Sequence, residues 1–311
     1  MERRTFLKTG AAGAIMEYLG VPNLRYAQVG ATPAYGGVAA AQTAASGEFR
    51  TKLKKSLYYG MLPGTLTVEE RFALARRLGF EGIEVPTFEE AAALAEVKAA
   101  STKTGLRVHS IMNQRHWKFP LSSADPAVVK QSIEGLETSL RNAREFGAEV
   151  VLLVPAVVNA DTSYRDAWTR SQANIRTVLP LARELNVCIA VENVWNKFLL
   201  SPLEFTRYID EFESPALKAY FDVGNIVLYG IPQDWIRTLG KRIVRVHVKG
   251  FDEKKREFTG LCEGTIDWRA VRRAFEDAGY SGWVTAELPG GDEAYLKGVS
   301  GCMDRIFKEE G

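Results

Sequence analysis

Four residues of the types that bind metal ions stand in four successive apolar segments of the C-terminal half of the chain. These residues are Glu192, Asp222, His247 and Glu287. An ionised side chain inside a buried strand is costly unless it is paired or metal-bound, so the repetition predicts one shared site. Three carboxylates and one imidazole suit a single divalent ion, Mn²⁺ first and Mg²⁺, Co²⁺ or Zn²⁺ as alternatives. Taken singly, Glu192 and Glu287 could be ion-pair partners at the rim, and His247 could be a core histidine.

The segments that carry these residues belong to a longer alternation of β-branched runs and helical patterns. The predicted strands cover residues 56–61, 82–85, 107–112, 150–154, 188–193, 217–223, 243–249 and 283–288. The predicted helices include residues 68–78, 126–146, 168–185, 202–212 and 268–278. Such alternation indicates a parallel sheet, and eight strands are the number that closes a (β/α)8 TIM barrel, an α/β fold. A doubly wound open sheet is less favoured, because no G-x-G-x-x-G pattern follows the first strand.

Side chains that contact a ligand in a barrel lie where strands end and βα loops begin. Seven further residues therefore become candidate substrate contacts: His109, His116, Trp117, Trp195, Asn225, Lys249 and Arg256. Lys249 lies two residues beyond His247 and shares its face of the strand. For His109 a core position is an equal alternative, and Trp117 could simply anchor a surface loop.

Composition narrows the classes of function. The chain has 311 residues, 40 Lys and Arg against 38 Asp and Glu, and three histidines. A net charge of +2 argues against nucleic-acid binding, which normally requires a basic excess. The three cysteines, Cys188, Cys262 and Cys302, form no C-x-x-C pair, which argues against zinc ribbons and thioredoxin-like motifs. A homo-oligomer is left open.

The N-terminus has the form of an export leader. Arg3 and Arg4 are followed by Thr-Phe-Leu-Lys, which resembles the twin-arginine signal of bacteria. Glu17 and Pro22 interrupt the apolar stretch, so it is too short for a membrane span and we expect no stable membrane insertion. We therefore assign residues 1–48 to a twin-arginine signal peptide with its linker, residues 49–311 to the barrel, and the protein to the periplasm. The alternative is a basic helix start on an exposed tail.

The strand-end motifs together resemble the xylose isomerase-like TIM barrel superfamily. They are Val191-Glu192-Asn193, Phe221-Asp222-Val223-Gly224-Asn225, Val246-His247-Val248-Lys249 and Ala286-Glu287-Leu288. The segment from Gly260 to Trp268 is similar to a G-E-G-x-hydrophobic-D-W motif of the sugar isomerase and epimerase branch, which includes ketose 3-epimerases and hydroxypyruvate isomerases. The resemblance runs from about Lys55 to the C-terminus.

This resemblance implies a metal-dependent sugar isomerase or epimerase. Glu192, Asp222, His247 and Glu287 would bind the metal, and Glu192 and Glu287 would also exchange the proton next to the substrate carbonyl through a cis-enediolate. The expected substrate is an unphosphorylated ketose or keto-sugar. Two features depart from the family pattern: Asn225 stands where a histidine is frequent, and the nearest candidate for the family's arginine is Arg256, in the loop after the His247 strand.

Other functions share the barrel. A lyase or hydrolase of 3-keto-glycosides would use the same metal and glutamates, and the sequence does not separate it from an epimerase. A sugar-binding protein without turnover would not require Glu192 and Glu287 as a pair. A trinuclear zinc endonuclease needs several histidines, and a chain with three in all does not fit it.

Overall fold

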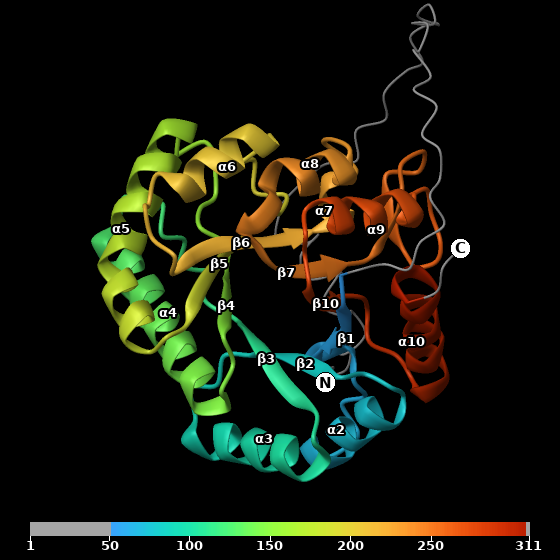
Figure 1. Ribbon diagram of the computed structural model, residues 1–311. Coiled ribbons are helices and arrows are strands. Elements are labelled where there is room, and N and C mark those ends of the chain that lie inside the picture. Colours follow the sequence, from blue (N-terminus) through green and yellow to red (C-terminus); the bar gives the residue numbers. More distant parts are fainter. Residues whose placement is uncertain (1–50, 309–311) are drawn as a thin grey trace, which may run out of the picture.

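A closed barrel of parallel strands occupies the centre of the molecule (Figure 1). The computed structural model describes residues 51–308, and in these the strand order round the barrel is β1-β10-β7-β6-β5-β4-β3-β2. The strands are β1 (Leu53–Tyr58), β2 (Gly82–Pro86), β3 (Arg107–Met112), β4 (Val150–Leu153), β5 (Cys188–Glu192), β6 (Leu217–Asp222), β7 (Ile243–Val248) and β10 (Gly282–Ala286). The predicted (β/α)8 fold is confirmed, while the predicted leader lies outside the described residues.

Helices surround the barrel and connect its strands (Figure 1). They are α2 (Val68–Arg77), α3 (Ala91–Thr104), α4 (Pro126–Phe146), α5 (Tyr164–Glu184), α6 (Pro202–Asp210), α7 (Val223–Ile226), α8 (Pro232–Leu239), α9 (Trp268–Asp277) and α10 (Glu293–Phe307). None of the helices in residues 51–308 is long and apolar enough to cross a membrane. Gly79, Gly147 and Gly279 follow helices at φ of +86°, +67° and +66°, which explains the glycine that recurs after the helical patterns.

The first strand differs from its prediction. It runs from Leu53 to Tyr58 instead of residues 56–61, because its pairing with β10 begins at Leu53 opposite Gly282. The chain then turns over the end of the barrel in a short 3-10 helix, Tyr59–Met61. The apolar character of this turn, with Met61 fully buried, gives it the same sequence pattern as a buried strand.

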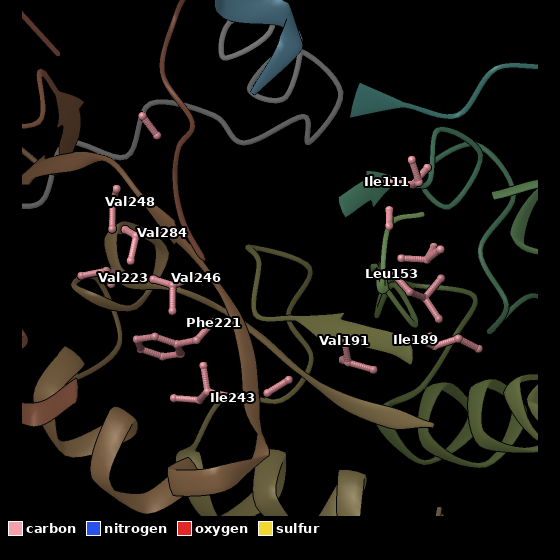
Figure 2. Packing of buried hydrophobic residues seen from close by; sticks show 14 of the residues in the cluster. Ile111, Leu153, Ile189, Val191, Phe221, Val223, Ile243, Val246, Val248 and Val284 are labelled. Atoms are coloured by element: carbon pink, nitrogen blue, oxygen red, sulfur yellow. The ribbon is translucent and has the colours of Figure 1, made fainter. Parts of the chain in front are cut away.

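Strand side chains alternate between two apolar layers. Outward-facing residues such as Ile189, Val191 and Phe221 pack in the large core that also includes helix residues (Figure 2). Ala190 and Tyr220 belong to a smaller cluster with residues of β4. Because successive side chains point to opposite faces, Glu192 and Asp222, two residues further along, face the barrel interior.

An additional feature follows β7. A small antiparallel hairpin, formed by β8 (Gly250–Asp252) and β9 (Glu257–Thr259), lies between β7 and α9 in the sequence. The segment after the hairpin is joined to α10 by a disulfide between Cys262 and Cys302. Neither the hairpin nor the disulfide was predicted, because both depend on contacts that are distant in sequence.

Candidate active site

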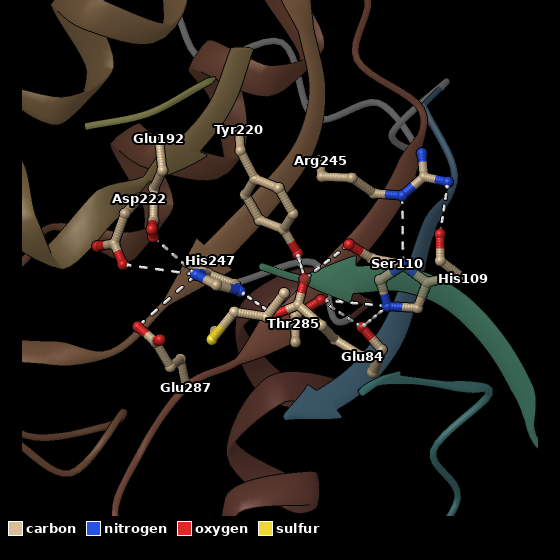
Figure 3. Close-up of polar contacts among 12 residues, drawn as sticks. Glu84, His109, Ser110, Glu192, Tyr220, Asp222, Arg245, His247, Thr285 and Glu287 are labelled. Atoms are coloured by element: carbon tan, nitrogen blue, oxygen red, sulfur yellow. Dashed lines mark hydrogen bonds and ion pairs between the residues drawn. The ribbon is translucent and has the colours of Figure 1, made fainter. Parts of the chain in front are cut away.

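The four residues predicted as ligands meet at one end of the barrel. One ligand atom from each of Glu192, Asp222, His247 and Glu287 lies within 4.8 Å of all the others. His247 Nδ1 is 2.9 Å from Glu192 Oε1, 3.6 Å from a Glu287 oxygen and 3.9 Å from an Asp222 oxygen, as Figure 3 shows. These distances and the chemistry of the donors make the cluster able to hold a metal ion.

Local structure explains how Asp222 is oriented. Its Oδ1 atom accepts a hydrogen bond from the backbone N–H of Asn225 and so caps the short helix α7. The side chain of Asn193 accepts from the backbone N–H of Asp222 and donates to its carbonyl, which joins the ends of β5 and β6. The other carboxylate oxygen, Oδ2, is buried and has the ammonium of Lys249 beside it at 2.7 Å. A buried carboxylate oxygen that faces the cluster and is paired with a cation is of the donor type that binds a divalent metal ion.

Lys249 is the cation closest to the cluster. Its Nζ atom lies 2.7 Å from Asp222 Oδ2 and 2.5 Å from Glu287 Oε2. Burial alone would lower the pKa of Lys249, but the surrounding carboxylates, Asp222 first, raise it above its usual value. The close approach of α7 depends on Gly224, since a Cβ atom there would be 2.5 Å from Lys249 Cγ. Lys249 is therefore a permanently charged donor at the edge of the site.

The two glutamates differ in their acidity in the metal-free protein. Burial raises the pKa of Glu192 to about 7, although His247 opposes the shift. Burial acts in the same direction on Glu287, but the charges of Lys249 and His247 outweigh it and lower its pKa to about 2. A pair of carboxyl groups whose pKa values are pushed apart is suited to acid and base roles.

We predict that binding of Mn²⁺ to the metal-free protein releases protons and weakens as the pH falls. Glu192, with its pKa of about 7, and His247, whose pKa is raised by Glu84 and Glu287 despite its burial, must both lose protons to become ligands. For each proton that the metal displaces, the apparent affinity for Mn²⁺ falls about tenfold per pH unit below the pKa of the group that loses it. Calorimetric titration in buffers of different ionisation enthalpy measures the protons released. Affinity independent of pH between about 6 and 8 would contradict this prediction.

Two of the four clustered residues, Glu192 and Glu287, line a cavity of about 770 Å³, while Asp222 and His247 are fully buried behind its wall. The cavity wall contains five aromatic side chains: Tyr58, Trp117, Trp195, Phe258 and Tyr295. Trp195 stacks on Phe258 of the hairpin with ring centres 4.8 Å apart, and its Nε1 donates to the carbonyl of Asn225. Aromatic faces of this kind pack well against the apolar faces of sugars.

His116 contributes a neutral imidazole to the cavity wall. Burial lowers its pKa to about 3. Its Nδ1 atom accepts a hydrogen bond from the backbone N–H of Val154, so the proton of the neutral ring is on Nε2. His116 can therefore donate to a substrate oxygen without exchanging protons near neutral pH.

The structure brings most of the predicted contacts to the cavity. His116, Trp117, Trp195, Asn225 and Lys249 line it. His109 does not: it is fully buried in the barrel, stacked on Trp283 and hydrogen-bonded to Ser56, so the core alternative describes its position. Arg256 lies exposed in the turn of the hairpin and is absent from the cavity wall.

One residue of the polar network was missed. Glu84, in the middle of β2, is fully buried, and its Oε1 lies 2.8 Å from His247 Nε2. The signal that identified the four clustered residues was present here too, because Glu84 stands between the apolar residues Ile83 and Val85. Tyr220, which donates a hydrogen bond to Glu84, gave no such signal.

Comparison with known proteins agrees with this geometry. The family described as xylose isomerase-like TIM barrel matches residues 72–305, and the chain belongs to this family. Among curated proteins it is similar to the L-ribulose-5-phosphate 3-epimerase UlaE of Salmonella typhi, with 27% identity over 246 residues, 75% of this chain and 86% of the relative. The chain is accordingly an enzyme of the isomerase class.

Solved structures share the fold. An L-ribulose 3-epimerase superposes with a TM-score of 0.70 at 20% identity, covering 82% of this chain and 95% of that structure. The 3-keto-D-glucoside 4-epimerase YcjR of E. coli gives a TM-score of 0.69 at 15% identity, covering 83% of this chain and 99% of that structure.

Proposed function

We propose that the protein is a divalent-metal-dependent epimerase of an unphosphorylated ketose or keto-sugar, with Mn²⁺ as the metal. The observation that carries this proposal is the pair Glu192 and Glu287, two carboxyl groups of opposite pKa shift that share one cluster at the cavity. The 27% identical curated relative is an epimerase, which supports the same reaction class. Glu192, Asp222, His247 and Glu287 would hold the metal.

In this reaction a proton leaves the carbon next to a carbonyl and returns on the other face. A bound divalent ion would supply the positive charge that stabilises the enediolate oxygens. The two glutamates come from β5 and β10, which flank β6 and β7 in the barrel, so they reach the cluster from different sides. Glu287, ionised near neutral pH, removes the proton and passes it to solvent, and Glu192, after taking a proton from solvent, delivers it from the other side. Lys249 and the Nε2–H of His116 donate hydrogen bonds to substrate oxygens.

The charges of the cavity wall favour a substrate without a phosphate group. Of the two lysines that line the cavity, Lys249 has its positive charge balanced by two carboxylates, although it can still donate a hydrogen bond to a neutral hydroxyl. The other, Lys255, is 66% exposed and lies 3.7 Å from carboxylate oxygens of Asp252 and Glu257. Within residues 51–308 no arginine lines the cavity, although arginine is well suited to binding phosphate. Here the protein would differ from its curated relative, which is named for a phosphorylated sugar.

A substrate panel tests this proposal. The Mn²⁺-loaded protein is incubated with ketopentoses, ketohexoses, their phosphate esters and 3-keto-glucosides, and the products are identified by NMR. Epimers of an unphosphorylated sugar are the expected result. Release of the aglycone from a 3-keto-glucoside would instead show the lyase or hydrolase reaction, and turnover of the phosphate esters alone would refute the substrate class.

We also propose that the protein is exported to the periplasm by the twin-arginine pathway. The Arg3-Arg4 motif carries this proposal, and the Cys262–Cys302 disulfide supports it, since disulfides persist mainly in oxidising compartments. A fusion of residues 1–48 to a reporter should be exported in a bacterium with this pathway. Export unchanged by Arg3→Lys together with Arg4→Lys would contradict the proposal.

The disulfide leads to a measurable prediction. Of the three cysteines of the chain, one, Cys188, has a free thiol in the structure. Protein from the periplasm, denatured without reductant, should therefore bind one equivalent of a thiol reagent and three after reduction. Peptide mapping by mass spectrometry should find Cys262 linked to Cys302. Three reactive thiols before reduction would contradict the expected disulfide.

A further inference from the structure

We propose that Glu84 is a positioning residue, which holds the ring of His247 so that Nδ1 faces the carboxylate cluster as a metal ligand. This inference rests on the proposed metal site. The imidazole lies between two sets of carboxylates: Nε2 is 2.8 Å from Glu84, while Nδ1 is 2.9 Å from Glu192 (Figure 3). Glu84 and His247 are both fully buried, so water does not supply an alternative partner.

Glu84 is itself fixed from two other strands. Its Oε2 atom accepts hydrogen bonds from Ser110 Oγ at 2.7 Å and from the Tyr220 hydroxyl at 2.8 Å. Ser110 belongs to β3 and Tyr220 to β6, so the carboxylate links strands on different sides of the barrel. The ring of Tyr220 also packs against His247, with centres 4.4 Å apart. The position of the imidazole is thus determined by four strands.

The pattern of donors decides which nitrogen of His247 carries the proton. The Oε2 atom of Glu84 accepts from Ser110 and Tyr220, and its Oε1 atom faces His247 Nε2, so we infer that the Nε2–H of His247 donates to Oε1. In the neutral ring the lone pair is then on Nδ1, which is the nitrogen facing Glu192, Asp222 and Glu287. A carboxylate behind a histidine ligand fixes its tautomer and makes the ligand nitrogen more basic.

A carboxylate at position 84, where a neutral amide would also fit, distinguishes a role in positioning His247 from a role in packing alone. A glutamine at this position could still accept from Nε2–H with its oxygen and donate to Ser110 or Tyr220 with its amide. Neutral hydrogen bonding would therefore be enough to satisfy the core. A buried charge is costly to maintain, so the glutamate is explained by its effect on the ring between it and the cluster.

Titration of the metal-free protein with Mn²⁺ tests this role. Glu84→Gln should weaken Mn²⁺ binding about tenfold to a hundredfold, the usual effect of losing such an outer partner. The matched control is Glu149→Gln. It removes a carboxylate that pairs with Arg245 and Arg107 instead of His247. The Mn²⁺ affinity of this variant should equal that of the wild type. Glu84→Gln could also destabilise the core, so Ser110→Ala serves as a second, milder variant. It removes a single hydrogen-bond donor to Glu84 and should weaken Mn²⁺ binding severalfold.

A second measurement separates positioning from stability. The chain has three histidines, so nitrogen-15 NMR of the Zn²⁺-loaded protein can follow each ring, with His247→Asn to assign the signals. The wild type should show His247 protonated at Nε2 and bound through Nδ1, whereas Glu84→Gln should lose this single form, because a glutamine can present either its oxygen or its amide nitrogen to Nε2. Equal metal affinity and an unchanged tautomer in Glu84→Gln and Ser110→Ala would overturn the role of Glu84. A wild type that binds no divalent ion would instead overturn the proposed function.

Discussion

Glu192→Gln and Glu287→Gln should each lower kcat about a hundredfold to ten-thousandfold, the range associated with loss of a general acid or base. Glutamine keeps the size of the side chain but neither accepts nor delivers a proton near neutral pH. The loss should fall on kcat more than on KM, because the affected step is proton transfer. Steady-state kinetics at saturating Mn²⁺ measure this, with metal content determined for each variant.

A surface glutamate provides the control for these variants. Glu145 lies on α4, is 56% exposed and pairs with Lys98, so Glu145→Gln should retain the wild-type kcat. Circular dichroism should show the same secondary structure in all three variants. Wild-type turnover in either Glu192→Gln or Glu287→Gln would remove that residue from the acid–base pair.

Removal of metal by chelation should lower activity at least about a hundredfold, because several kcal/mol of charge stabilisation would be lost. Addition of Mn²⁺ should restore activity. The Tm should also rise with Mn²⁺ concentration, since a ligand that binds only the folded state stabilises it. Within residues 51–308 the three carboxylates lie beside the charged groups of His247 and Lys249, fewer than the carboxylates themselves, so stabilisation by an added cation should be readily measurable.

The metal effect has its own control. Asp222→Asn removes a buried carboxylate of the cluster, and it should abolish the Mn²⁺-dependent rise in Tm. Full turnover by chelated protein, with metal absent by elemental analysis, would contradict the proposed metal dependence.

The sequence was sufficient to predict the barrel and the four clustered residues, because both follow from local alternation. Glu192 and Asp222 are the last residues of their strands, which is where barrel sites are built. His109 shows the limit of this rule: it lies three residues before the end of β3, about 10 Å deeper at roughly 3.3 Å per residue. A strand prediction that lacks depth therefore gave the mouth and the core as equal alternatives for His109, and the structure places it in the core.

Other features depend on closure of the barrel. Glu84 has the local signal of a buried acid, but its contact with His247, 163 residues away in sequence, exists only once β2 and β7 are placed round the same ring. The disulfide and the hairpin that carries Phe258 are likewise set by packing between distant segments. Local spacing also could not determine that Arg256, in the turn of this hairpin, would remain outside the cavity.

Hydrogen–deuterium exchange during turnover tests the central claim most directly. The Mn²⁺-loaded protein is incubated in D₂O with an unphosphorylated ketose or keto-sugar that it converts, and product and recovered substrate are examined by NMR and mass spectrometry. Proton transfer through Glu192 and Glu287 predicts one solvent deuterium at the epimerised carbon next to the carbonyl, with none incorporated by Glu287→Gln. Formation of the epimer without deuterium at that carbon would contradict the proposed mechanism.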